Sequence, residues 1–356
     1  MPRTDRTSLL LAVALLTGHA QAEPATCPGG AGAAGPTIGL RIDNDVLGGQ
    51  DQGYSNGIQL GAASADLADP LAGPCRWPIT GWLARRLLPL KPLGATAQHL
   101  NVSLSQAIFT PRNRSSTALI PSDRPYAAVL LFGLGYNARV DNRLQSSLLQ
   151  VGIVGPSARG REAQDAIHKL TGDKPFLGWD NQLHDEGVFR LLHERLQRHV
   201  LSDTGAPSHT GGWDAVTHWG AGVGNLLTHA DIGGELRWGP GLPDDFGSTP
   251  TRQADGRIED GGQAPGAGSA GVRSFHGFAS IDARWVLRDI SLDGNAFRHS
   301  HRVDKEPVVA DFGYGLALTW GPWRMVLARF HRTREFRGQE DLPVFGSLTI
   351  SRRLSF

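Results

Sequence analysis

Acidic, amide and hydroxyl side chains gather where the first two predicted strands meet. Residues 43–45 (Asp-Asn-Asp) end the first strand, and residues 55–57 (Ser-Asn-Gly) begin the second. Side chains alternate between the two faces of a strand, so Asp45 and Ser55 should be inward-facing neighbours across a hairpin, with Asn44 on the outer face. Such groups can bind a ligand or a metal ion. The simpler interpretation is that Asn, Asp and Gly are ordinary turn residues.

A histidine on a predicted helix could act as a base. The pattern of apolar residues over 160–170 predicts a helix that ends at Gly172, and His168 follows Gln164 by one turn. The chain has 13 histidines, so a single histidine is weak support for catalysis. No Gly-x-Ser-x-Gly elbow occurs, which disfavours a serine hydrolase. A histidine that takes a proton from water remains, together with carboxylates that suit a hard cation such as Ca²⁺.

The composition limits the class of protein. The 356 residues include 35 Lys and Arg and 34 Asp and Glu, and this balance argues against a nucleic-acid partner. Residues 1–22 read as a signal peptide with a basic start, an apolar run and a small-residue cleavage site, which leaves 23–356 as the mature domain. Export permits a disulfide between Cys27 and Cys75, and unpaired thiols remain the alternative.

Alternation with a period of two dominates the rest of the chain. Residues 308–320 place large apolar and aromatic side chains on one face and small or polar ones on the other. The last strand ends at Phe356, and a terminal aromatic resembles the signal read by the barrel assembly machinery of the outer membrane. These features favour a transmembrane β-barrel over a β-sandwich, whose strands are shorter and whose outer faces are polar.

We predict an all-β fold, a twelve-stranded antiparallel transmembrane barrel with a short helix in an extracellular loop. The even count places both termini on the periplasmic side. Residues 241–272, rich in Gly, Asp and Pro, are predicted to be flexible. The predicted strands cover 36–46, 54–64, 98–109, 126–138, 145–154, 186–199, 213–224, 230–239, 273–290, 307–320, 322–335 and 344–356.

Short motifs in a fixed order resemble those of the outer-membrane lipid A 3′-O-deacylase family. They are Ile42-Asp43-Asn44-Asp45, Tyr54-Ser55-Asn56-Gly57, Ile108-Phe109-Thr110-Pro111, Asp123-Arg124-Pro125-Tyr126, Val154-Gly155-Pro156-Ser157, Gln164 with His168, and Gly178-Trp179-Asp180-Asn181. The resemblance covers most of the mature chain. It implies a twelve-stranded barrel in the bacterial outer membrane, acting on lipid A of lipopolysaccharide, with Ca²⁺ as cofactor.

The resemblance also implies roles for residues. His168 would be the general base, Asn44 and Asp45 would shape the site and help to hold Ca²⁺, and Ser55 stands where relatives carry Thr or Ser. Some members have an acidic residue six positions after the histidine, where this chain has Lys174. The missing ligand would then come from elsewhere, with Asp173 and Glu186 as the candidates.

Arginines are our candidates for the lipid A phosphates, because a guanidinium binds phosphate through paired hydrogen bonds. Arg112, Arg114 and Arg124 are the residues predicted to do so. For Arg124 the alternative is a structural ion pair with Asp123 or a loop carboxylate. Two alternatives stay open. The protein could hydrolyse a phospholipid ester, or it could be a barrel without enzymatic activity, which Lys174 in place of an acidic residue would favour.

Overall fold

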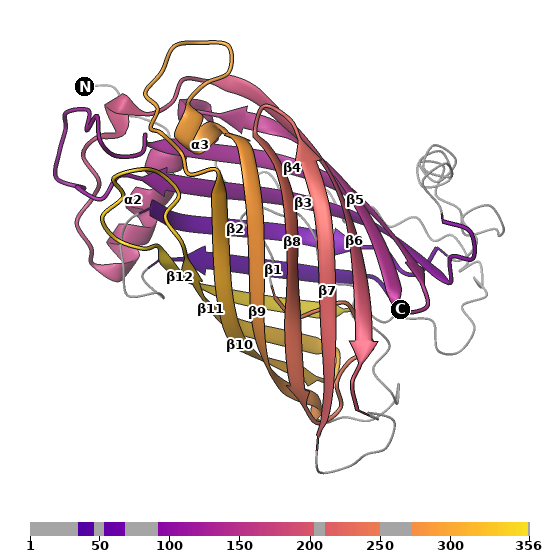
Figure 1. Ribbon diagram of the computed structural model, residues 1–356. Coiled ribbons are helices and arrows are strands. Elements are labelled where there is room, and N and C mark those ends of the chain that lie inside the picture. The colour runs from indigo at the N-terminus through magenta and orange to yellow at the C-terminus, as the bar shows by residue number, and fades with distance from the viewer. Residues whose placement is uncertain (1–34, 46–52, 68–91, 203–210, 250–271, 355–356) are drawn as a thin grey trace, which may run out of the picture.

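The protein is a closed β-barrel of twelve antiparallel strands (Figure 1). The computed structural model describes residues 35–45, 53–67, 92–202, 211–249 and 272–354. Each strand pairs with its neighbours in sequence, and the first pairs with the last. The strands are β1 (Thr37–Asn44), β2 (Gly53–Ala63), β3 (Ala97–Thr110), β4 (Ala127–Val140), β5 (Arg143–Val154), β6 (Glu186–Val200), β7 (Gly212–Val223), β8 (Leu227–Gly239), β9 (Val272–Asp289), β10 (Val308–Trp320), β11 (Trp323–Arg332) and β12 (Val344–Arg353).

Helical segments lie at one end of the barrel, which we name the upper rim. The connection from β5 to β6 contains the 3-10 helix η3 (Pro156–Ala158), the helix α2 (Gly160–Thr171) and the 3-10 helix η4 (Trp179–Asn181), and α3 (Ile290–Asp293) follows β9. None of the helices in the described ranges is long and apolar enough to cross a membrane.

The predicted fold class is confirmed, and the strand bounds differ from the prediction by only a few residues. The helix expected over 160–170 is present as α2. The short α3 was not predicted. It depends on a local cap, in which the Asp289 carboxylate accepts a hydrogen bond from the backbone N–H of Ser291 at 2.9 Å.

The two faces of the wall differ in chemistry. Large apolar side chains alternate outward and stay exposed, as Leu60, Leu104 and Ile281 do. Polar and charged residues alternate inward and are buried, as Gln59, Ser105 and Asp282 are. This apolar exterior around a polar lumen is the pattern of a barrel surrounded by lipid.

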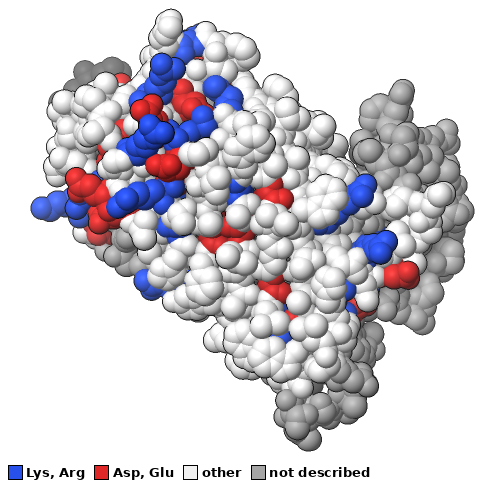
Figure 2. All heavy atoms as spheres, viewed as in Figure 1, with Lys and Arg blue, Asp and Glu red and all other residues white. Residues whose placement is uncertain are grey.

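Charged residues on the exterior gather at the upper rim. Figure 2 shows one face, on which Lys, Arg, Asp and Glu crowd over the loops at the α2–α3 end and are sparse along the wall. The wall in that view is therefore suited to hydrocarbon, whereas the upper rim is suited to water and to charged headgroups.

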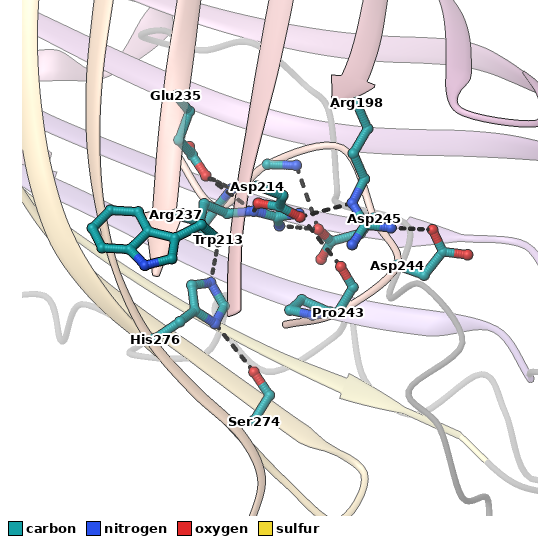
Figure 3. A network of polar contacts seen from close by, with 12 residues as sticks. Arg198, Trp213, Asp214, Glu235, Arg237, Pro243, Asp244, Asp245, Ser274 and His276 are labelled. Atoms are coloured by element: carbon teal, nitrogen blue, oxygen red, sulfur yellow. Dashed lines mark hydrogen bonds and ion pairs between the residues drawn. The ribbon is translucent and has the colours of Figure 1, made fainter. Parts of the chain in front are cut away.

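A segment from the opposite, lower rim folds into the lumen. Residues 240–249, between β8 and β9, reach arginines on several strands through Asp244 and Asp245 (Figure 3). Asp245 pairs with Arg237 of β8 and Arg324 of β11, so the segment lies across the barrel. We name residues 240–249 the lumen segment. The prediction of flexibility is wrong for it, because its carboxylates are anchored by buried guanidinium groups.

Several predictions fall outside the described residues. They are the signal peptide over 1–22, both cysteines, Cys27 and Cys75, and the terminal Phe356. Ser55 lies in β2 by its backbone, and its side chain is not among those described.

Candidate functional site

Helix α2 lies against the outer surface of the barrel wall. Ile108 of β3 and Ala128 of β4 share the outward phase of exposed neighbours on their strands, yet they are buried. They pack with Ala158, Phe176 and Trp179 from the segments that flank α2. The apolar cluster therefore holds the helix on the side of the wall that faces lipid, close to the upper rim.

The beginning of α2 needs a glycine. A Cβ on Gly160 would overlap the Cβ of Ala128 and lie 3.0 Å from the Trp179 ring. The helix starts after Arg159, whose φ of 59° is left-handed, and it ends at Gly172, whose φ is 81°. These two turns fix where the helix begins and ends, and so they fix the side chains on its wall-facing side.

His168, in the last turn of α2, is buried with both ring nitrogens in contact with protein groups. It is 3% exposed. Its Nδ1 lies 2.7 Å from the carbonyl oxygen of Lys174, and its Nε2 lies 2.8 Å from the amide nitrogen of Gln164. A carbonyl oxygen only accepts, so Nδ1 carries a proton and donates it. In the neutral ring Nε2 is then the atom with a lone pair, and it accepts from the Gln164 amide.

This arrangement makes Nε2 of His168 the proton-accepting atom. The Nδ1 contact fixes the tautomer and the ring orientation, which is the usual requirement for a histidine base. The Phe176 ring, with its centroid 5.4 Å from that of His168, packs against the imidazole. Gln164 is also buried, and its Oε1 makes no hydrogen bond within the described part of the chain. An unused oxygen therefore lies beside the base.

Lys174 contacts the site through its backbone. Its side chain is exposed, while its carbonyl oxygen orients the imidazole of His168. Position 174 therefore lies next to the histidine for a reason that does not depend on its side chain. Asp173, the predicted substitute ligand, is exposed beside it.

Tyr126 is the other titratable side chain packed in this cluster. Its ring centroid lies 5.0 Å from that of Trp179. Burial raises the pKa of the Tyr126 phenol, the nearby backbone of Gly178 opposes this, and the charge of Asp123 adds to it. The phenol is therefore neutral over the physiological range. His168 is the better proton acceptor of the two.

The ends of β1 and β2 bring amide side chains to the same outer surface. Asn44 pairs in register with Asn56, and Asn56 pairs with Ile108 beneath the helix. Neighbouring strands are about 4.8 Å apart, so Asn56 and Asn44 lie one and two strands from the helix-covered strand β3. On β3 itself Gln106 donates to the Ala158 carbonyl at 2.6 Å and ties the wall to η3.

Asp45 is buried directly after Asn44, and Asp43, two positions earlier, is buried in the inward phase of β1. Asp43 pairs with Arg41 at 3.2 Å and accepts from the hydroxyl of Ser347 at 2.6 Å. A break in the β2–β3 register falls between Tyr54 and Asn56, at the place of Ser55. The register of β1 and β2 ends at the pair Asn44 and Asn56, so Asp45 and Ser55 flank that last pair.

Glu186 is not brought to His168. It lies on the inward phase of β6 and is buried. Its carboxylate accepts from the backbone N–H groups of Ala296 and Phe297 at 3.0 and 3.1 Å. Its predicted part in a shared metal site with His168 is therefore not supported. Nothing in the local sequence could reveal this, because the amides come from a loop more than a hundred positions later.

Arg124 also has a structural place. It is 1% exposed, pairs with Glu335 at 2.9 Å and donates to the Ser291 hydroxyl at 3.0 Å. Its guanidinium lies 4.9 Å from the centre of the Phe109 ring. A guanidinium that is so enclosed and already paired is poorly placed to meet a lipid phosphate, so the predicted phosphate contact of Arg124 is not supported. The alternative of an ion pair with a loop carboxylate is confirmed.

The other two arginines stay near the surface of the upper rim. Arg112 forms ion pairs with Glu340 and with Asp341, the latter at 3.1 Å, and remains about half exposed. Arg114 is partly buried, and its carbonyl accepts from the N–H of Leu177 at 2.9 Å. A cleft of about 420 Å³ lies beside Arg112, between the loops that follow β3 and β11.

Oxygen donors predominate at His168 and on the wall beside the helix-covered strand. The carbonyl of Lys174 and the amide of Gln164 lie at the imidazole, the amides of Asn44 and Asn56 lie on the outer face of β1 and β2, and Asp45 follows Asn44 in the inward phase of β1. Oxygen atoms of carboxylates, carbonyls and amides are the ligands that Ca²⁺ prefers. The donor set is therefore compatible with Ca²⁺, with few carboxylates among the described residues.

Comparisons with known proteins agree with this architecture. The profile of the family described as outer membrane protein LpxR matches residues 9–354. LpxR from Salmonella typhimurium is a similar solved structure, with 18% identity, a TM-score of 0.65, and 89% of this chain and 100% of that chain covered.

More distant solved barrels are the β domain of the Bordetella autotransporter BrkA, at 11% identity and a TM-score of 0.38, and the translocator domain of NalP from Neisseria meningitidis, at 9% and 0.37. They cover 91% and 90% of this chain, and are themselves covered over 100% and 89%. No curated protein matches the sequence. The match over nearly the whole chain places the protein in the LpxR family of outer-membrane β-barrels.

Proposed function

We propose that the protein is a Ca²⁺-dependent hydrolase that removes the 3′-O-linked acyl group from lipid A. The observation that carries the proposal is the position of His168, which is buried on α2 against the outer face of the wall, with Nε2 as its accepting atom. An ester of an outer-leaflet lipid approaches the barrel from that side. A soluble substrate would instead be expected to meet a site in the lumen.

In the proposed reaction His168 takes a proton from the attacking water at Nε2, while the Lys174 carbonyl holds Nδ1–H. In this structure the Gln164 amide donates a hydrogen bond to Nε2 of His168, so the amide must rotate away before a water molecule can bind there. Its Oε1 can then accept the second hydrogen of that water. Ca²⁺, when bound, polarises the ester carbonyl and stabilises the oxyanion. Asp45, Asn44 and Ser55 are the residues that we expect to hold it.

The test is mass spectrometry of lipid A incubated with the purified, folded chain, with Ca²⁺ and with a chelator. We expect loss of the 3′-linked acyl group only with Ca²⁺. His168→Ala should lower the rate by at least about a hundredfold, the scale of general-base catalysis. The matched control is His199→Ala, which removes an exposed histidine on β6 that bonds Thr217. Full activity of folded His168→Ala would end the proposal.

A second candidate is hydrolysis of a phospholipid acyl ester. The lack of available arginines favours this candidate, because Arg124 is enclosed and Arg112 is already paired with Glu340 and Asp341. A site with few available cations suits a less anionic substrate. Vesicles that contain both lipids decide between the two, since lysophospholipid would form in place of deacylated lipid A. Loss of neither acyl chain would point to an inactive relative, and Lys174→Glu is then the variant to try.

A further inference from the structure

A second group of potential metal ligands lies inside the barrel, on the opposite face of the wall from His168. His218 of β7, Asp231 of β8 and Asp282 of β9 are all buried. Each offers one ligand atom, and these atoms lie within 4.8 Å of one another. His218 Nε2 is 2.8 Å from Asp282 Oδ2 and 4.0 Å from Asp231 Oδ2.

The strand register explains how the histidine reaches an aspartate two strands away. His218 pairs with Gly233 of β8, and Gly233 pairs with Asp282 of β9. A Cβ on Gly233 would lie 2.6 Å from Cε1 and 2.8 Å from Nε2 of His218. The missing side chain lets the imidazole lie across β8. The wall is therefore built to bring this nitrogen to a carboxylate.

A second glycine, two residues nearer the upper rim on β7, makes room for a side chain in the same way. Gly220 pairs with Glu194 on one side and with Asp231 on the other. A Cβ there would be 2.7 Å from the Glu194 Cγ and 3.2 Å from Asp231 Oδ1. Glu194 is buried as well. The absence of a side chain at 220 thus makes room for a further carboxylate beside the group of three.

The group borders a cavity of the right size for an ion. A space of about 20 Å³ is lined by His218, Asp282 and Asp311 of the wall and by Phe246 and Gly247 of the lumen segment. One water-sized sphere needs about 10–15 Å³. The cavity therefore has room for one ion or one water molecule next to two of the three ligands.

The positive charge of the neighbouring arginine is directed mainly elsewhere. Arg284 Nη2 lies 2.8 Å from Asp311, and its Nε lies 3.5 Å from Asp282 Oδ1. Asp282 Oδ2, the atom that meets His218, is the other oxygen of that carboxylate. The arginine and a cation can thus share Asp282 through different oxygens.

We propose that His218, Asp231 and Asp282 bind one divalent transition-metal ion of the zinc class within the lumen. One imidazole nitrogen and two carboxylate oxygens, with a water in the fourth position, form a ligand set that such ions accept. The ion would replace the proton shared by His218 and Asp282 and would link β7, β8 and β9. This site is independent of the proposed deacylase.

The experiment uses the His168→Ala chain, so that the deacylase site cannot contribute an imidazole. The protein is refolded into detergent with Zn²⁺ present, freed of unbound metal by gel filtration, and its zinc is measured by mass spectrometry. We expect about one Zn²⁺ per chain. Adding Asp231→Asn and Asp282→Asn together should lower bound zinc at least about tenfold, because the neutral amides that replace the carboxylates are poor metal ligands. Electrophoretic mobility without heating reports folding.

Two further variants separate ligands from general effects. Gly233→Ala removes no ligand, but its Cβ would crowd both the His218 ring and the carbonyl oxygen of Ile281, and it should also lose zinc. His199→Ala removes an exposed histidine and should keep about one zinc per chain. Absence of zinc from the folded His168→Ala chain would show that the three residues form only an ion pair, and zinc retained by the double Asn variant would place it elsewhere. If the double variant does not fold, Co²⁺ replaces Zn²⁺ as the probe in the His168→Ala chain. Visible absorption bands of bound Co²⁺ that disappear when Gly233→Ala is added would support the site, and bands that persist would contradict it.

Discussion

Gln164 occupies the nitrogen of His168 that is proposed to accept a proton. At 2.8 Å the amide is close enough for a carboxylate in its place to form an ion pair with the imidazolium. Gln164→Glu should favour the protonated ring, so a higher pH is needed to free the base. We expect the acid limb of the kcat/KM profile for deacylation to move up by about one pH unit.

Gln164→Ala is the control for this shift, because it removes the amide and adds no charge. Its profile should keep the acid limb of the unmodified protein, with a change in rate only. If the limb of Gln164→Glu stays in place while the chain deacylates lipid A, the titrating base is not His168.

The sequence identifies the candidate site residues better than it identifies their partners. His168, Asn44 and Asp45 stand in short motifs, and strand alternation assigns the latter two to opposite faces of the wall. Arg124 could not be placed in the same way. Its partner Glu335 is 211 positions away, and only the closed barrel brings the two together. An arginine in a loop motif looks exposed until that pairing is known.

At the scale of elements, the seat of α2 controls the proposed activity. Gly160→Leu would drive a side chain into Ala128 and Trp179, and such overpacking costs about 1–3 kcal/mol. The helix should lift from the wall and carry His168 away, so deacylation should fall at least about tenfold. The measurement is the lipid A assay, together with gel mobility to show that the barrel is folded.

Gly187→Leu is the matched control, because no atom lies within 4 Å of a Cβ at that position. It lies at the start of β6 and should retain deacylase activity. A folded Gly160→Leu chain with normal activity would mean that the close packing of α2 on β4 does not position the base.

Elements with a strong repeat could be predicted, and those held by tertiary contacts could not. Alternation over residues 308–320 determines both the extent of β10 and the side that meets lipid. Gly172 after an amphipathic run marks the end of α2. The lumen segment carries no repeat, and its composition of Gly, Pro and Asp is that of an exposed loop. Its place depends on arginines from β4, β6, β8 and β11.

For the whole molecule, Asp245 is the main anchor of the lumen segment. Its carboxylate is buried between Arg237 and Arg324, whereas neighbouring Asp244 is about half exposed between Arg139 and Arg198. Removing one partner of a buried ion pair costs about 3–5 kcal/mol, and an exposed pair costs far less. Asp245→Asn should therefore lower the apparent melting temperature clearly, and Asp244→Asn only slightly. Equal effects would contradict this role for Asp245.

The same anchor has a defined response to acid. Burial alone would raise the pKa of the Asp245 carboxyl, but the charges of Arg324 and Arg237 outweigh it and hold that pKa well below its usual range. A depressed folded pKa gives stability that is complete above the unfolded value of about 4 and is lost as the pH falls through the folded value. The lumen segment should stay anchored at about pH 5 and loosen only in stronger acid. Melting curves of Asp245→Asn should lack this part of the acid dependence.

A barrel crossed by its own segment should not conduct. The lumen is occupied at the lower rim by residues 240–249, and ion pairs tie them to strands on several sides. We expect the protein to be silent in planar bilayers at neutral pH, which argues against the channel alternative. Replacing Asp244 and Asp245 together with Asn removes the segment's anchors and two negative charges, while Arg139, Arg198, Arg237 and Arg324 stay around the lumen. That variant should show anion-preferring openings, because the exposed charges are positive. Steady conductance by the unmodified protein would mean that the segment leaves the lumen in the membrane.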